Sequence, residues 1–119
     1  MSENRWEPEK KFNYKKAKAI IGKTIVIGLT YYDHNGGFIE IKQMHGKIRT
    51  ANNKEGVGVL LENRQNEGEL FWLPNDLSAI KKAEKGIYES KNTGEVVEYP
   101  DYISTWEITK PGPEFQTEE

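Results

Sequence analysis

The sequence predicts a mainly β fold: a small, strongly bent antiparallel β-barrel with a short N-terminal helix and one helical turn late in the chain. Three observations support this prediction. From Lys23 onward, apolar and polar residues alternate in five to seven short segments, which is the period of strands with one buried face. Turn-forming residues separate these segments about every 8 to 12 positions. The chain has 119 residues, which favours one domain and is short for a β-sandwich.

The distribution of charged residues distinguishes the two ends of the chain from a central domain. We expect a disordered N-terminus over residues 1–11, a single domain over residues 12–110 and a disordered acidic tail over residues 111–119. Residues 1–23 carry seven Lys/Arg and three Asp/Glu, whereas residues 107–119 carry one and four. A basic end and an acidic end therefore flank a nearly balanced core.

The composition excludes several kinds of site. Because the chain has no cysteine, it has no disulfide, no zinc–thiolate site and no cysteine nucleophile. No apolar run approaches the roughly 18 residues that span a bilayer, and the amino terminus lacks the apolar stretch of a signal peptide. We therefore expect a cytoplasmic protein without a membrane partner.

Residues 12–21, FNYKKAKAII, predict a short helix with Asn13 as its N-cap and Gly22 as its end. A helix this short needs packing against a core to persist. Its inward residues would be Ala17, Ile20 and Ile21. Its outward residues would be Lys15, Lys16 and Lys18.

The next segment, TIVIGLTYY, alternates as a half-buried strand, and the DHNGG that follows it predicts a hairpin turn. In such a turn the side chains of Asp33 and Asn35 bond to nearby backbone, and Gly36 and Gly37 supply positive φ. His34 would then lie at the exposed tip.

The second strand begins at Phe38 and changes face along its length. Its apolar residues occupy first odd and then even positions, and they are Ile39 and Ile41, followed by Met44, Gly46 and Ile48. A strand cannot change face without a bulge or a sharp bend, so we place one near Lys42 and Gln43. Such a bend suits a strand that passes from one side of a small barrel to the other.

The remaining segments predict short strands around one helical turn. VGVLLEN and ELFWLP are two such strands. In LPNDLSAIKKAEKG, Asn75 or Asp76 caps a helical turn that buries Leu77 and Ile80. IYES, KNTGEVVEY and YISTWEI complete the fold, with a hairpin turn at residues 92–94.

The order of these parts resembles an SH3-like barrel over residues 22–108: a bent second strand, short third and fourth strands, a helical turn, then closing strands. The phrases GKTIVIGLTYYD, MHGKI, WLPNDL and TGEVVEYPDY are also similar to small uncharacterised bacterial proteins. This resemblance implies a fold and no particular activity.

The motifs of catalytic and metal sites are missing, so we expect a protein that is not an enzyme and has no cofactor and no metal. DHNGG fails three of the five ligand requirements of a calcium-binding EF-hand loop. His34 and His45 are the only histidines and lack metal-ligand spacing. No serine lies in a nucleophile elbow, and no Gly-rich phosphate loop is present. A deep pocket lined by His45 and two carboxylates would instead favour an enzyme.

The aromatic residues carry the remaining functional signal. We expect Trp72 and Trp106 in the core and the tyrosines with polar neighbours at the surface. Pro100 biases Tyr99 toward an extended backbone, which makes EYPDY a fairly rigid loop, and rigid tyrosines make good protein contacts. The predicted partner-binding face consists of Tyr32, Glu98, Tyr99, Asp101 and Tyr102.

The carboxylates around these tyrosines disfavour nucleic acid and favour a basic protein partner. The leading hypothesis is therefore a non-catalytic cytoplasmic interaction module, such as an inhibitor or immunity-type protein. One alternative is an enzyme of unknown class, and the other is a nucleic-acid-associated barrel that uses the basic residues of segment 10–23. These residues are Lys10, Lys11, Lys15, Lys16, Lys18 and Lys23.

Overall fold

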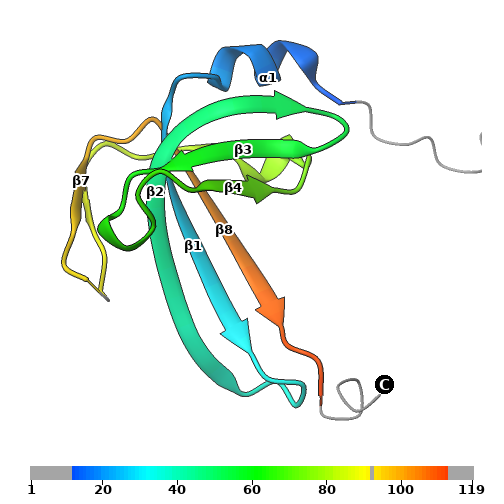
Figure 1. Ribbon diagram of the computed structural model, residues 1–119, viewed down its shortest axis with the longest axis vertical. Helices are drawn as coiled ribbons and strands as arrows, with labels where there is room; N and C mark the ends of the chain where they lie inside the picture. The colour runs from blue at the N-terminus through cyan, green and yellow to red at the C-terminus, as the bar shows by residue number, and fades with distance from the viewer. Residues whose placement is uncertain (1–11, 92, 113–119) are drawn as a thin grey trace, which may run out of the picture.

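The computed structural model describes residues 12–91 and 93–112 (Figure 1). It is mainly β, as predicted, with helix α1 (Tyr14–Ile20) ahead of the strands and short 3₁₀ turns among them. The strands are β1 (Thr24–Tyr32), β2 (Phe38–Asn52), β3 (Gly56–Leu61), β4 (Leu70–Leu73), β5 (Lys81–Lys82), β6 (Ile87–Glu89), β7 (Val96–Glu98) and β8 (Tyr102–Thr109). We expected disorder in residues 1–11 and 111–119; of these, residues 1–11 and 113–119 lie outside the described residues.

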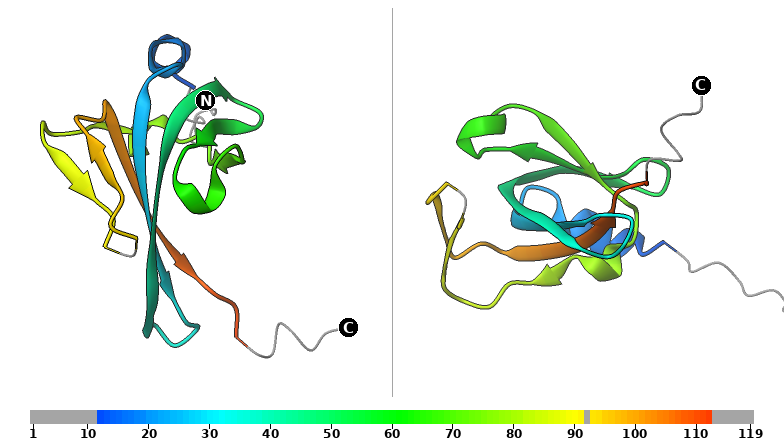
Figure 2. Two further views of the ribbon diagram at one scale, coloured as in Figure 1. Left: turned by 60° about the vertical axis from the view of Figure 1, so that its left-hand side comes forward. Right: turned by 90° about the horizontal axis from the view of Figure 1, so that it is seen from below.

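Six strands form one strongly curved sheet in the order β4-β3-β2-β1-β8-β5, and β6 and β7 form a separate hairpin (Figures 1 and 2). The prediction of a closed antiparallel barrel is wrong in two respects. The outermost strands β4 and β5 do not pair with each other in the described part of the chain, and β1 runs parallel to β8. Because β4 has four residues and β5 only two, these strands offer few backbone groups with which to close the sheet.

The core fills the inner face of this curved sheet. Ile25, Ile27 and Leu29 of β1 are buried, as the predicted alternation requires. Val26 on the opposite face is buried too, so this part of β1 is covered on both faces. The late helical turn is also confirmed as the 3₁₀ turn Leu77–Ala79, whose N-cap Asp76 accepts a hydrogen bond from the N–H of Ser78. The buried cluster comprises Ala17, Ile20, Ile25, Ile27, Leu29, Met44, Ile48, Val57, Val59, Leu61, Leu73, Leu77 and Ile80.

Helix α1 begins where the sequence predicts. The Oδ1 of Asn13 accepts a hydrogen bond from the N–H of Lys16 at 3.0 Å, which is the N-cap contact. Ala17 and Ile20 are buried, as expected. Ile21 is exposed instead, because the helix ends at Ile20 and the backbone of Ile21 is already extended.

The lysines of α1 differ in their surroundings. Lys15 and Lys18 are exposed, as predicted. The prediction is wrong for Lys16, whose Nζ donates hydrogen bonds to the carbonyls of Leu77 at 2.7 Å and Ile80 at 2.8 Å. The carbonyl of Leu77 also accepts the N–H of Ile80 within the turn, so the ammonium of Lys16 adds a second donor there. The two contacts of Lys16 tie α1 to the 3₁₀ turn.

The DHNGG segment forms the predicted turn between β1 and β2. The carboxylate of Asp33 accepts hydrogen bonds from the N–H groups of Gly37 at 2.7 Å and Asn35 at 2.9 Å. These bonds, that of Gly37 first, lower the pKa of Asp33 below its ordinary value. Gly36 has a φ of +89°, but Gly37 is not in the left-handed region, so only one glycine fills its predicted role. His34 is exposed at the tip, as expected.

The bulge predicted in β2 at Lys42 and Gln43 is wrong, because β1 and β2 pair without a register shift through both residues. The register shifts instead at Ile39, against β1, and at Arg49, against β3. Ile39 and Ile41 point away from the core and are exposed. The lower half of β2 extends past the core (Figure 1), so its apolar residues have no buried face to turn toward.

The two tryptophans predicted for the core lie in different places. Trp72 is exposed on the outer face, where its indole ring covers Gly58 on β3, so the prediction for Trp72 is wrong. Trp106 packs against the core while remaining partly exposed, and its Nε1 donates a hydrogen bond to the Oγ of Ser104 at 2.9 Å. That hydroxyl in turn donates to the carbonyl of Ala79 at 2.8 Å, which satisfies the buried serine.

Candidate partner-binding surface

The β6–β7 hairpin packs on the outer face of β1 and β2, and it lies on the other side of these strands from β3 and β4 (Figure 2). Tyr88 pairs with Val97, and both are partly buried against Val26 and His45. Because side chains alternate across a strand, the neighbours of Tyr88 and Val97 point away from the sheet. The hairpin therefore has one packed face and one free face.

Polar contacts fasten this hairpin to the sheet. The carboxylate of Glu95 accepts a hydrogen bond from the N–H of Arg64 at 2.7 Å, and it lies 3.1 Å from the Nε of the same arginine. On the other strand, the Oε1 of Gln43 accepts a hydrogen bond from the N–H of Lys91 at 2.7 Å. Both contacts join residues far apart in the sequence, so the hairpin presents its free face from a fixed position.

The free face combines apolar and acidic side chains. Ile87 is 61% exposed, Val96 is 52% exposed and the adjoining Tyr99 is 64% exposed. Ile87 pairs with Glu98, and Val96 pairs with Glu89, so each of these two apolar residues has a carboxylate directly across the hairpin. Both glutamates are exposed. We call these five residues the hairpin face.

The backbone of Tyr99 is unusual. Its φ is +49°, in the left-handed region, so the prediction of an extended conformation is wrong. The N–H of Tyr99 donates to the carbonyl of Gly86 at 2.8 Å, and the following Pro100 is buried. These anchors hold the backbone in a strained conformation while the side chain points into solvent, and such strain is enriched at functional sites.

Of the predicted partner-binding residues, Glu98 and Tyr99 belong to the hairpin face, but Asp101 has a structural partner. Its carboxylate accepts hydrogen bonds from the N–H and the Oγ1 of Thr24, both at 3.0 Å. The Thr24 hydroxyl accepts the N–H of Asp101 at 2.9 Å in return. The backbone bond to Thr24, followed by its hydroxyl and the charge of Lys23, lowers the pKa of Asp101 below its ordinary value. Asp101 therefore joins the beginnings of β1 and β8.

The two other predicted tyrosines do not contribute to the hairpin face. Tyr102 is partly buried and packs against the core. It pairs with Ile25 at the beginning of β1, whereas Tyr32 ends that strand. Seven residue steps along β1 lead from Ile25 to Tyr32, which corresponds to roughly 23 Å. The five predicted residues therefore do not form one continuous face.

Ile87, Glu89 and Val96 were not among the residues predicted for the partner-binding face. Their segments carry apolar residues at both odd and even positions, as in Ile87 beside Tyr88, so alternation does not show which face is buried. The available signal was the hairpin itself, since a short two-stranded hairpin can bury only one side.

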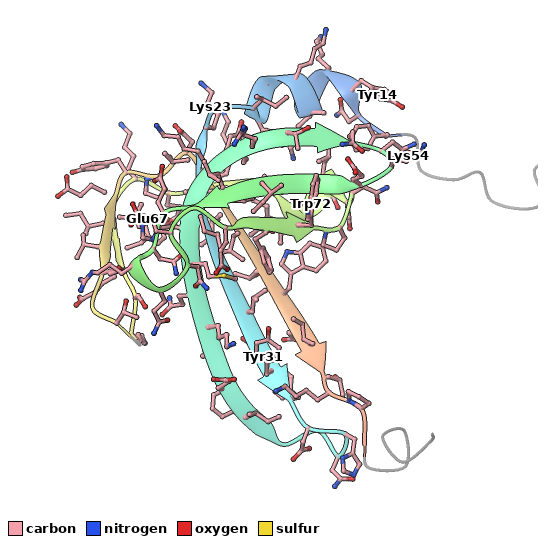
Figure 3. All side chains as sticks on the ribbon, in the orientation of Figure 1. Tyr14, Lys23, Tyr31, Lys54, Glu67 and Trp72 are labelled. Carbon is pink, nitrogen blue, oxygen red and sulfur yellow. The ribbon has the colours of Figure 1, made fainter. Side chains whose placement is uncertain are left out.

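The basic residues of the nucleic-acid alternative that the structure describes lie in α1 and just before β1. Lys23 lies at the α1 end of the molecule (Figure 3), where its charge acts on Asp101. Lys15, Lys18 and Lys23 are exposed, Lys16 is partly buried, and Lys10 and Lys11 lie outside the described residues.

A small cavity lies beneath the hairpin and is bordered by His45, Glu89 and Glu95. Its volume is about 20 Å³, which accommodates about one water molecule. A cavity of this size does not admit a substrate, and the carboxylate of Glu95 is already bonded to Arg64.

Two further properties concern residues 12–91 and 93–112 alone. Within them, no three His, Asp or Glu side chains are arranged to hold a metal ion. Within the same residues, no helix has the length and apolarity to cross a membrane.

Comparison with known proteins gave no match to a protein family, a curated protein or a solved structure. The resemblance to SH3-like barrels therefore stays a prediction.

Proposed function

We propose that the protein is a non-catalytic cytoplasmic interaction module whose hairpin face binds a basic partner protein. One observation carries the proposal: Ile87, Val96 and Tyr99 are each more than half exposed, and Glu98 and Glu89 lie across the hairpin from Ile87 and Val96. Single exposed apolar residues are common on protein surfaces, whereas an apolar group bordered by charges is typical of an interaction site.

The apolar residues of this face supply binding energy, and the carboxylates supply selectivity. Complete burial of an isoleucine or valine side chain contributes about 1.5–3 kcal/mol, so the exposed part of Ile87 or Val96 corresponds to roughly 1–2 kcal/mol. Glu89 and Glu98 would pair with lysine or arginine and accelerate association with a basic surface. An inhibitor or immunity-type protein that masks such a surface fits this combination.

Affinity capture with matched variants tests the proposal. Ile87→Thr combined with Val96→Thr keeps β-branched side chains in both strands and removes apolar surface from the hairpin face. Leu70→Thr changes an exposed apolar residue of β4 and is the control. We expect the double variant to lose the partner that the wild-type protein and the control retain. Equal capture by all three proteins would contradict the proposal.

The charge requirement is tested with the purified partner. Glu98→Lys reverses a charge on the hairpin face, and Glu107→Lys reverses an exposed charge on β8. We expect the Glu98 variant to bind at least about fivefold more weakly and with a smaller salt dependence, because a rim charge contributes about 1 kcal/mol. Equal effects of the two reversals in calorimetric titrations would show that net charge, and not this face, determines binding.

A second candidate function, nucleic-acid binding, is favoured by one pairing. Thr24 pairs with Lys47, which sets Lys47 close to Lys23, and Arg49 is exposed further along β2. This function predicts binding to DNA or RNA that weakens steeply as salt is added. Lys23→Gln combined with Lys47→Gln should reduce the salt slope, and a lack of binding at low salt would exclude this candidate.

A further inference from the structure

The lower half of β2 is paired on one side only. β3 pairs with β2 from Gly46 to Asn52, whereas residues 38–44 have β1 as their only neighbouring strand in the described part of the chain. In Figure 1 this half of β2 extends below β3 and β4. We call residues 38–44 the free edge.

The backbone of the free edge can accept another strand. The carbonyl of His45 accepts a hydrogen bond from the N–H of Glu62, so the backbone of His45 points toward β3. Backbone direction alternates along a strand, and therefore Gln43 and Ile41 point their N–H and C=O groups to the same side, away from β1. An edge of this kind is a template for pairing with a further strand.

The surface beside the free edge is apolar. Phe38 is 62% exposed and Ile41 is 40% exposed. Together with Glu40, Gln43 and Lys91, these two residues line a groove of about 410 Å³. Large apolar side chains are thus exposed beside backbone groups that have no partner strand. The bulge at Ile39 and the charges of Glu40 and Lys42 restrict which strand can pair there.

The charges of the free edge indicate which strand binds there. Tyr31 pairs with Glu40 and Leu29 pairs with Lys42, so Glu40 and Lys42 share the inner face of the sheet on either side of Ile41. When two copies of this edge pair antiparallel around Ile41, each Glu40 lies opposite the Lys42 of the other copy. The edge is therefore complementary to itself, which is the requirement for a two-fold interface.

We propose that the protein forms a symmetric dimer in which the free edges of two copies pair antiparallel, centred on Ile41. The two Ile41 residues exchange backbone hydrogen bonds across the axis, and each Gln43 bonds near the bulged Ile39 of the other copy. Seven residues per copy bury less area than the interface of a stable complex, so the dimer is weak and forms as protein concentration rises. This surface is distinct from the hairpin face.

Variants that reverse the charge of Glu40 or Lys42 test whether the dimer forms through the free edge. Glu40→Lys places like charges opposite each other at both ends of the interface, and so does Lys42→Glu. By sedimentation velocity from micromolar to millimolar concentration, we expect the wild-type protein to dimerise and each single variant to dimerise about tenfold more weakly or not at all. An equimolar mixture of the two variants restores both unlike pairs, so it should recover the dimer as a heterodimer.

Two observations would overturn the proposal. One is a wild-type protein that stays monomeric throughout this concentration range. The other is dimerisation that is unchanged in both single variants, or that the mixture does not recover. Hydrogen exchange gives a second readout, because the amides of Ile41 and Gln43 should become protected as the dimer forms. Ile87→Thr, on the hairpin face, should leave the dimer unchanged, which separates this interface from the proposed partner-binding surface.

Discussion

Replacing Lys16 with methionine removes the ammonium that links α1 to the late 3₁₀ turn. The methionine keeps an unbranched apolar side chain in place of the lysine stem, so packing along the helix is largely retained. The change removes the hydrogen bonds to the carbonyls of Leu77 and Ile80, which are 2.7 and 2.8 Å long and partly buried. Both carbonyls then lose a charged donor, although the carbonyl of Leu77 keeps its bond from the N–H of Ile80.

The expected loss of stability follows from these two bonds. A hydrogen bond to a charged group contributes about 1.5–3 kcal/mol in a protected site. Since water can reach a partly buried carbonyl, we take about 1 kcal/mol for each bond, or about 2 kcal/mol in total. For a domain of this size, such a loss lowers the melting temperature by roughly 8 °C.

Urea unfolding followed by circular dichroism measures this effect against matched controls. Lys15→Met and Lys18→Met alter exposed lysines of the same helix and should change the free energy of unfolding by less than about 0.5 kcal/mol. If Lys16→Met falls within this range as well, the two carbonyl contacts do not stabilise the fold, and the reasoning is refuted.

Two more predictions concern the strands. Asp101→Asn keeps an acceptor for Thr24 but removes its charge, so it should lower stability at neutral pH by about 1 kcal/mol. Because the folded state lowers the pKa of Asp101, this difference from the wild type should be present above about pH 4 and disappear as the pH falls further. Gly58→Ala should destabilise by about 1 kcal/mol or more, because the added methyl group lies 3.1 Å from ring atoms of Trp72 and closer still to a neighbouring methyl. Gly28→Ala should be neutral or stabilising, because its nearest contact is an ordinary 3.6 Å.

Either result can be contradicted by the same unfolding measurements. A wild-type advantage over Asp101→Asn that persists unchanged at pH 2 would show that the carboxylate charge is not its source. Equal stability of Gly58→Ala and Gly28→Ala would show that the Trp72 ring moves aside without loss.

Features determined by neighbouring residues were predictable from the sequence. The Asn13 cap and the Asp33 turn each depend on a side chain that bonds to backbone no more than four positions away. Burial of Leu77 and Ile80 followed from the spacing of one helical turn. In these segments the local preferences of the chain agree with the final fold.

Features determined by the extent of the core were not predictable in the same way. The face change assigned to β2 assumed that every apolar residue is buried, but Ile39 and Ile41 lie where β2 has passed beyond the core. The closed barrel assumed strands long enough to meet, and β5 has only two residues. Periodicity indicates which residues share a face, and it does not indicate where the opposing layer ends.

The residues of the candidate site were predicted only in part, because one of them makes its contact with a distant part of the chain. Glu98 and Tyr99 were identified from exposed aromatic and acidic character, and both belong to the hairpin face. Asp101 was assigned to that face because it lies two positions from Tyr99, yet its carboxylate bonds to Thr24. A contact between residues 77 positions apart leaves no local pattern in the sequence.

The parallel pairing of β1 with β8 also determines the order in which the protein can fold. β1, β2, β3 and β4 form a meander of neighbouring strands, whose contacts close short loops. β8 must find β1 across 77 residues, so its docking is entropically expensive and should be the slow step. During synthesis, β1 leaves the ribosome well before β8, and the edge of β1 stays unpaired for several seconds. The centre of the finished sheet is therefore the last part to be protected from aggregation.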